Sequence, residues 1–160
     1  VRVVGADAVA APALVYLAQA GVGRLWLDDP ELAAPSDAGS WLLGPEAVGR
    51  PRAEAAAAAL APFSGFVEVG TYPLGGVPTA TLVVASSSAQ ALGAAEVARR
   101  ARVPHVVVEA DGDGGAVVSV PPGAPCYACA RGSSGGGRQL REGCCTLGAT
   151  TKHDKSKRIR

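Results

Sequence analysis

Short apolar runs typical of strands alternate with alanine-rich segments typical of helices over the first 120 residues of the chain. Strands are predicted at 1–4, 24–27, 65–69, 81–85, 103–108 and 116–120, and helices at 10–20, 51–60 and 89–101. Pro12 is tolerated only in the first turn of a helix, which places the first helix start near Ala10 or Ala11. Strand and helix segments spaced in this way indicate a mostly parallel sheet with helices on both faces.

The composition divides the chain near Gly132. Hydrophobic residues make up 48% of the 160 residues and charged residues 18%, which is typical of one folded domain. Residues 131–160 carry eight Lys and Arg against two Asp and Glu, after a Gly/Ser-rich stretch. We therefore expect a Rossmann-like α/β domain at 1–130 and a disordered tail at 131–160. The composition of the tail fits a natural basic tail and an unrelated end equally.

The charge balance bears on partners and location. A net charge of +1 supplies no general field for nucleic acid or an anionic membrane, and no apolar run is long enough to span a bilayer. Only the basic tail supports the alternative hypothesis of a nucleic-acid-binding module. The chain opens on a strand, without a targeting signal, so we expect a cytoplasmic protein and a piece of a longer one.

The first strand-to-helix turn is the place where a doubly wound sheet binds phosphate. Glycines there let the backbone approach the ligand, and the helix N-terminus offers free amides. This turn reads Gly5-Ala6-Asp7-Ala8-Val9-Ala10, so only the first glycine of a GxGxxG pattern is present. The carboxylate of Asp7 would repel a phosphate and could instead cap the helix.

Two further groups of residues carry candidate chemistry. Asp28 ends the second strand at the distance from Gly5 expected of an acid that binds ribose hydroxyls, although a loop-starting Asp has the same spacing. Cys126 and Cys129 form a Cys-x-x-Cys turn, which can supply two thiolates to Zn²⁺. The remaining zinc ligands would come from Cys144, Cys145 or His153. By contrast, His105 lies within a strand and is expected to be packed in the core.

Several segments together resemble the ThiF-type adenylyltransferases, which are kin to the molybdopterin-synthase adenylyltransferase and the ubiquitin-activating enzymes. The matching segments are 1–5, 12–23, 25–28, 48–52, 103–104 and 125–129. The resemblance covers 1–130 and identifies the chain as a divergent, truncated member. It implies ATP and Mg²⁺ as cofactors, a ubiquitin-like carrier protein or a peptide as substrate, and a homodimer or heterodimer.

The resemblance also assigns site residues by position. The nucleotide would lie on Gly5, Ala6 and Asp7, with its ribose on Asp28. The phosphate-binding lysine of the family falls on Arg52, which keeps the charge. The metal-binding aspartate falls on Ser88, and residues 85–89 contain no carboxylate, so no catalytic residue is assigned. Electrostatic groups of this kind each contribute about 100- to 1,000-fold in rate.

These departures leave several functions open. The first is an adenylyltransferase-like domain whose catalysis is weak or lost, serving as the non-catalytic, partner-binding part of an adenylating complex. The second is an active enzyme in which Arg24, Arg50 and Arg52 serve the phosphates and Asp28 or Asp29 holds the metal. The third is a Rossmann dinucleotide-binding protein of another class.

Overall fold

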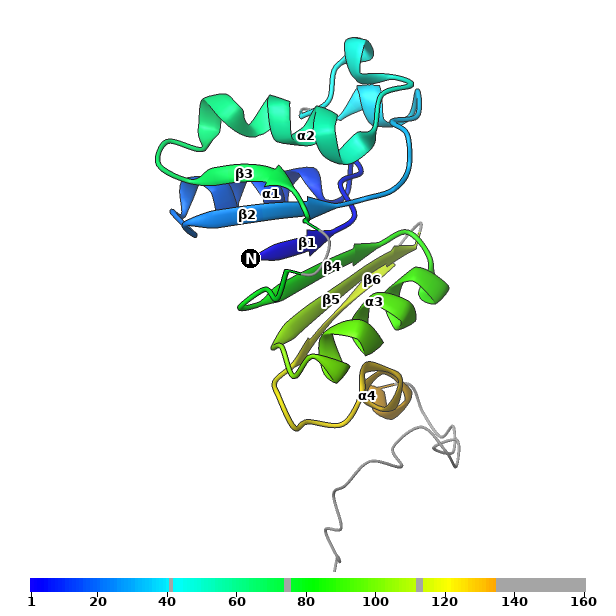
Figure 1. Cartoon of the computed structure of the whole chain (residues 1–160). Helices are drawn as coiled ribbons and strands as arrows, with labels where there is room; N and C mark the ends of the chain where they lie inside the picture. Colours follow the sequence, from blue (N-terminus) through cyan, green and yellow to red (C-terminus); the bar gives the residue numbers. More distant parts are fainter. Residues whose placement is uncertain (41, 74–75, 112–113, 135–160) are drawn as a thin grey trace, which may run out of the picture.

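A computed structural model describes residues 1–40, 42–73, 76–111 and 114–134 of the chain (Figure 1). Its strands are β1 (Arg2–Val4), β2 (Arg24–Asp28), β3 (Glu68–Thr71), β4 (Thr81–Ala85), β5 (His105–Asp111) and β6 (Gly114–Val120). Its α-helices are α1 (Ala11–Gln19), α2 (Arg52–Leu60), α3 (Ser88–Arg100) and α4 (Tyr127–Ser134). Short 3-10 helices span Asp37–Gly39, Pro45–Ala47 and Ala61–Phe63.

The strands form one six-stranded sheet in the order β3-β2-β1-β4-β5-β6. All neighbouring strands are parallel except β6, which runs antiparallel to β5. The chain moves outward from β1 through β2 to β3, then returns to β4 on the other side of β1 and continues outward. This arrangement confirms the predicted Rossmann-like fold, with the strand order reversing between β1 and β4.

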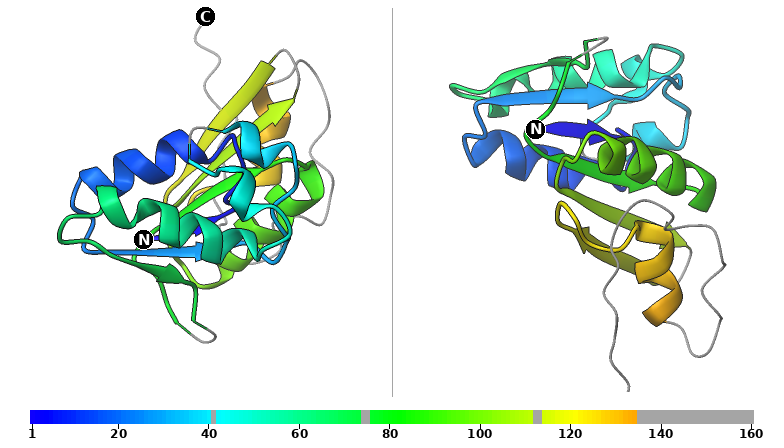
Figure 2. Two further views of the ribbon diagram at one scale, coloured as in Figure 1. Left: turned by 90° about the horizontal axis from the view of Figure 1, so that it is seen from above. Right: turned by 60° about the horizontal axis from the view of Figure 1, so that its bottom comes forward.

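Alternate residues of each strand enter two separate cores. Val3 joins the apolar cluster beneath α1 and α2, whereas its neighbour Val4 joins the cluster beneath α3. The same alternation separates Val84 from Val83 on β4. Helices therefore cover both faces, α1 and α2 on one and α3 and α4 on the other (Figure 2).

The helix starts follow local sequence rules. Pro12 lies in the first turn of α1, where its missing N–H costs no hydrogen bond. Ser87 caps α3, because its side-chain oxygen accepts a hydrogen bond from the Gln90 N–H at 3.3 Å. Both helices begin within a residue of the predicted position.

The third strand was predicted wrongly at 65–69. Gly65 has φ +51°, and the Val67 N–H donates to the Ser64 carbonyl at 2.7 Å, so these residues form a turn. Extended backbone begins only at Glu68. The local apolar pattern could not reveal this, because a single valine within a turn looks like the start of a strand.

The C-terminal part of the structure ends in α4, which runs past the predicted domain boundary at residue 130. The rest of the predicted tail, including Cys144, Cys145 and His153, lies outside the described residues. Among the helices that are described, none has the length and apolar character needed to cross a membrane.

Two buried polar side chains lie opposite each other on β4 and β5. Thr81 and His105 are register partners, and each is at most 4% exposed, so the prediction that His105 is packed is confirmed. His105 Nδ1 lies 3.0 Å from the Val103 carbonyl oxygen and is placed to donate to it. Within the described part of the chain, Thr81 Oγ1 and His105 Nε2 have no hydrogen-bond partner.

Replacing Thr81 with valine should therefore stabilise the fold. The change removes a buried hydroxyl without altering the side-chain shape, and we expect the free energy of unfolding to rise by about 1 kcal/mol. Urea denaturation measures this difference. The exposed Thr79→Val variant is the control and should change the same quantity by less than about 0.5 kcal/mol. A clear loss of stability in Thr81→Val would show that the hydroxyl has a stabilising partner.

Candidate functional site

The candidate site lies where the strand order reverses, at the carboxyl end of β1. Gly5 follows this strand with φ +91°, and its N–H donates to the Asp28 carbonyl oxygen at 3.1 Å. A Cβ atom at Gly5 would lie 2.1 Å from the Val84 carbonyl oxygen on β4. The first glycine of the predicted turn is therefore required both for its backbone conformation and for the close approach of β1 to β4.

Backbone N–H groups of this turn donate hydrogen bonds to carboxylate side chains of the chain itself. The Ala6 N–H donates to Asp29 Oδ2 at 2.8 Å. The Val9 and Ala10 N–H groups both donate to Asp7 Oδ1, at 3.0 Å each. Asp7 thus caps the turn that precedes α1, whereas the helix itself begins at Ala11 without a side-chain cap. In a phosphate-binding turn, such amides face the ligand.

Arg52, at the start of α2, is enclosed by three carboxylates. Its Nη1 lies 3.1 Å from Asp29 Oδ2, its Nε 3.0 Å from Asp37 Oδ2, and its Nη2 3.1 Å from Glu31 Oε2. The side chains of Arg52, Asp29 and Asp37 are 12%, 1% and 6% exposed. We call Asp29, Glu31, Asp37 and Arg52 the Arg52 cluster.

Local folding explains how these side chains converge. The Asp29 carboxylate also accepts the Glu31 N–H, and that of Asp37 accepts the Ala34 N–H, so both acids shape the loop after β2. Burial alone would lower the pKa of Arg52, but the Coulombic attraction of Asp29 and its hydrogen bond, followed by Asp37 and Glu31, raise it above its ordinary value. Arg52 is therefore a permanent cation whose charge is already balanced.

The predicted ribose ligand, Asp28, binds a different cation. Its Oδ2 accepts hydrogen bonds from Arg2 Nε, at 2.9 Å, and from Arg2 Nη2. The guanidinium carbon of Arg2 lies 4.4 Å from the centre of the Tyr72 ring. The structure thus brings Gly5, Ala6 and Asp7 together in one turn. It places Asp28 next to that turn, with Arg52 joined to it through Asp29.

Sequence reasoning missed the residues that complete these contacts. Arg2 pairs in register with Trp26, and Asp28 lies two residues further along β2, so the two side chains share one face of the sheet. The sequence does not give the register between the two strands. Asp37 gave no signal in the sequence, because it lies in a long loop without periodicity. Asp29 was predicted only as an alternative metal ligand, whereas here it binds Arg52 and the Ala6 N–H.

The predicted metal positions are partly described. Ser88 begins α3 on the exposed surface, with no carboxylate at 85–89. Cys126 Sγ lies 3.2 Å from Cys129 Sγ, so the two sulfur atoms do face one side of the turn. Within the described residues, no group of three or more His, Cys, Asp or Glu side chains could hold a metal ion. The zinc site therefore stays a prediction.

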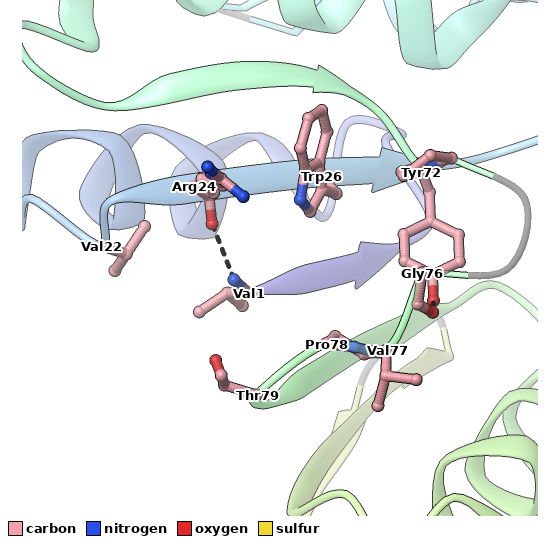
Figure 3. Close-up of a pocket in the computed structure, with 10 residues that line it drawn as sticks. Val1, Val22, Arg24, Trp26, Tyr72, Gly76, Val77, Pro78 and Thr79 are labelled. Carbon is pink, nitrogen blue, oxygen red and sulfur yellow. Dashed lines mark hydrogen bonds between the residues drawn. The ribbon is translucent and has the colours of Figure 1, made fainter.

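A shallow pocket of about 290 Å³ lies on the part of the sheet that α3 does not cover (Figure 3). Trp26 and Arg24 of β2 form one side of it, and the segment leading from β3 to β4, with Tyr72 and Pro78, forms the other. Arg24 is paired with Glu68 at 3.0 Å and lies at the amino end of β2, away from Gly5.

Comparison with solved structures identifies the architecture. The Microcin C7 biosynthetic enzyme MccB in complex with N-formylated MccA superposes with a TM-score of 0.69 at 19% identity, over 87% of this chain and 44% of that one. The chain has the fold of MccB. E. coli MccB alone gives a TM-score of 0.68 at 18% identity, over 89% of this chain. E. coli MccB with ATP gives 0.65 at 20% identity, over 81%.

These comparisons confirm the fold implied by the predicted resemblance, because MccB is a ThiF/MoeB-family adenylyltransferase. The chain spans less than half the length of the MccB chains that it matches. No family model and no curated protein matches its sequence.

Proposed function

We propose that the chain is a ThiF-type adenylyltransferase-like domain that has lost ATP-dependent catalysis and serves as the non-catalytic, partner-binding part of an adenylating complex. The observation that carries this proposal is the hydrogen bond from the Ala6 N–H to the buried Asp29 carboxylate. The turn that would meet the nucleotide phosphates is thereby closed by a negative charge of the chain itself.

The residues present do not fit a magnesium triphosphate. Asp7, Asp28, Asp29, Glu31 and Asp37 lie at the turn and its neighbouring loop. The cations Arg2 and Arg52 beside them already form ion pairs, and Arg50 is exposed. Transfer of an adenylate needs cations on the departing pyrophosphate and a carboxylate on the metal. Residues 85–89 offer no such carboxylate.

An active enzyme with rearranged phosphate ligands has less support. Arg24 lies at the amino end of β2, and Gly5 follows the carboxyl end of the neighbouring β1. The charge of Arg52 is already balanced by carboxylates, so only the exposed Arg50 is left of the three proposed cations. A dinucleotide-binding protein of another class would need the same turn amides, so their occupation by Asp7 and Asp29 weighs equally against it.

The similar structures support a proposal for the partner class. MccB is solved in complex with N-formylated MccA, and E. coli MccB is solved with ATP. We propose a peptide or a ubiquitin-like carrier as the partner of this chain, within a homodimer or heterodimer. Zn²⁺ bound by Cys126 and Cys129, with further ligands outside the described residues, would be structural.

Pyrophosphate exchange tests the loss of catalysis. The full chain is mixed with ATP, Mg²⁺, labelled pyrophosphate and N-formylated MccA as the acceptor probe, with MccB as the positive control. We expect no exchange above background, because the phosphate-binding amides are occupied. Exchange that depends on Mg²⁺ would contradict the proposal and favour the active enzyme.

A further inference from the structure

Cys126 and Cys129 lie at the start of α4 with their sulfur atoms in contact. The Cys126 carbonyl accepts the Ala130 N–H at 3.0 Å, a hydrogen bond of the first helical turn, and Cys129 belongs to the same turn. Side chains three positions apart lie on one face of a helical turn. The two Sγ atoms are accordingly 3.2 Å apart, with the Cys126 thiol donating to the Cys129 sulfur. Closing this pair into a disulfide requires a movement of about 1 Å.

The surrounding fold holds this turn in place. Helix α4 lies against α3 (Figure 1), and Tyr127, between the two cysteines, is 2% exposed in the apolar cluster beneath α3. Ala124 packs against the same cluster, and its N–H donates to the Pro121 carbonyl oxygen at 3.1 Å. The backbone therefore needs no further ordering when the two sulfur atoms react. Such pre-organisation raises the effective concentration of one thiol toward the other.

The two thiols differ in exposure. Cys126 is 8% exposed, whereas Cys129 is half-buried. A small disulfide in solution can therefore reach Cys129 first. Cys126 is shielded from the same molecule but lies in contact with the Cys129 sulfur. The geometry thus separates a thiol that attacks from a thiol that completes the reaction.

We propose that Cys126 and Cys129 form a reversible intramolecular disulfide by exchange with low-molecular-weight disulfides. The Cys129 sulfur loses its proton to solvent and attacks one sulfur of the small disulfide, which releases one thiol and leaves a mixed disulfide. The Cys126 sulfur then loses its proton, attacks the Cys129 sulfur and displaces the second thiol. The protein pair is oxidised by two electrons, and the small disulfide is reduced to two thiols. A dithiol reductant reverses both steps.

This inference goes beyond the proposed function and does not depend on it. The proposed Zn²⁺ site uses the same two sulfur atoms, so the disulfide forms in the metal-free dithiol and excludes the metal. Pyrophosphate exchange concerns the turn after β1, at another part of the fold. The outcome of either experiment therefore leaves the other undecided.

Peptide mapping by mass spectrometry tests the inference. The reduced, EDTA-treated full chain is equilibrated with reduced and oxidised glutathione in the absence of air, and remaining thiols are blocked with iodoacetamide. Trypsin separates Cys126 and Cys129 from Cys144 and Cys145, because arginines lie between the two pairs. We expect the peptide with Cys126 and Cys129 to escape blocking and to carry no glutathione. Chymotrypsin, which cuts after Tyr127, should divide it into two peptides that part only on reduction.

Serine variants test the order of the two steps. Cys126→Ser should stop at the mixed disulfide, with one glutathione on Cys129. Cys129→Ser leaves only the buried thiol, which should react at least about tenfold more slowly than the thiol left in Cys126→Ser. Replacing both Cys144 and Cys145 with serine is the control and should leave the yield of the disulfide unchanged.

Concentrated urea shows whether the fold holds the turn. We expect the equilibrium constant between disulfide and dithiol to fall at least about tenfold on unfolding, because the two sulfur atoms then separate. An equal constant in the folded and the unfolded chain would overturn the inference. Thiols that stay reduced while the chain keeps Zn²⁺ through the EDTA treatment would overturn it as well. So would a disulfide to Cys144 or Cys145 in place of the one within the turn.

Discussion

Replacing Arg52 with methionine is expected to lower the free energy of unfolding by about 3–5 kcal/mol, because removal of one partner leaves buried charges without compensation. Asp29 and Asp37 are 1% and 6% exposed, and both lose their cation in this variant. The loop after β2 would lose its side-chain ion pairs to α2 at the same time. Urea denaturation with tryptophan fluorescence measures the change.

Two further variants make the Arg52 prediction specific. The exposed Arg50 lies just before α2, and Arg50→Met should change the free energy of unfolding by less than about 0.5 kcal/mol. Adding Asp29→Asn and Asp37→Asn to Arg52→Met should recover part of the loss, because the buried negative charges are then absent. An Arg52→Met variant as stable as wild type would contradict the description of the cluster as a buried ion network.

Replacing Gly5 with alanine should have an effect of similar size. The new Cβ would lie 2.1 Å from the Val84 carbonyl oxygen, so β1 and β4 must separate at the centre of the sheet. The backbone would also be held at φ +91°, which disfavours any residue with a side chain. Together, the clash and the backbone strain should cost about 3 kcal/mol.

Gly21 provides the matched control for Gly5. It has φ +72° at the end of α1, but a Cβ there would meet nothing within 4 Å. Gly21→Ala should therefore cost only the backbone strain, about 1 kcal/mol in urea denaturation. Equal losses of unfolding free energy in the two variants would show that the clash between β1 and β4 does not add to the cost of Gly5→Ala.

Much of the fold was predictable because its signals are local. Apolar runs and alanine-rich stretches located the strands and helices, and Pro12 located the start of α1 to within a residue. The exception was β3, where the turn at Gly65 and Ser64 delays the strand until Glu68. Its cause is a positive φ and a backbone hydrogen bond, which the apolar pattern does not report.

The candidate site was less predictable because its contacts are long-range. The loss of the glycine pattern at Asp7 was visible in the sequence, and it pointed to an altered phosphate site. The partner of Ala6 was not visible, because Asp29 reaches it from the end of another strand. Arg52 could be assigned by motif to a phosphate, yet only the folded loop reveals that Asp29, Glu31 and Asp37 already bind it.

The most direct test of the central claim is a calorimetric titration of the full chain with ATP in the presence of Mg²⁺. If Asp7 and Asp29 close the turn amides, as their hydrogen bonds at 2.8–3.0 Å indicate, no saturable binding should be detected below about 1 mM ATP. Micromolar binding that requires Mg²⁺ would contradict the account, because the turn would then open to receive phosphates.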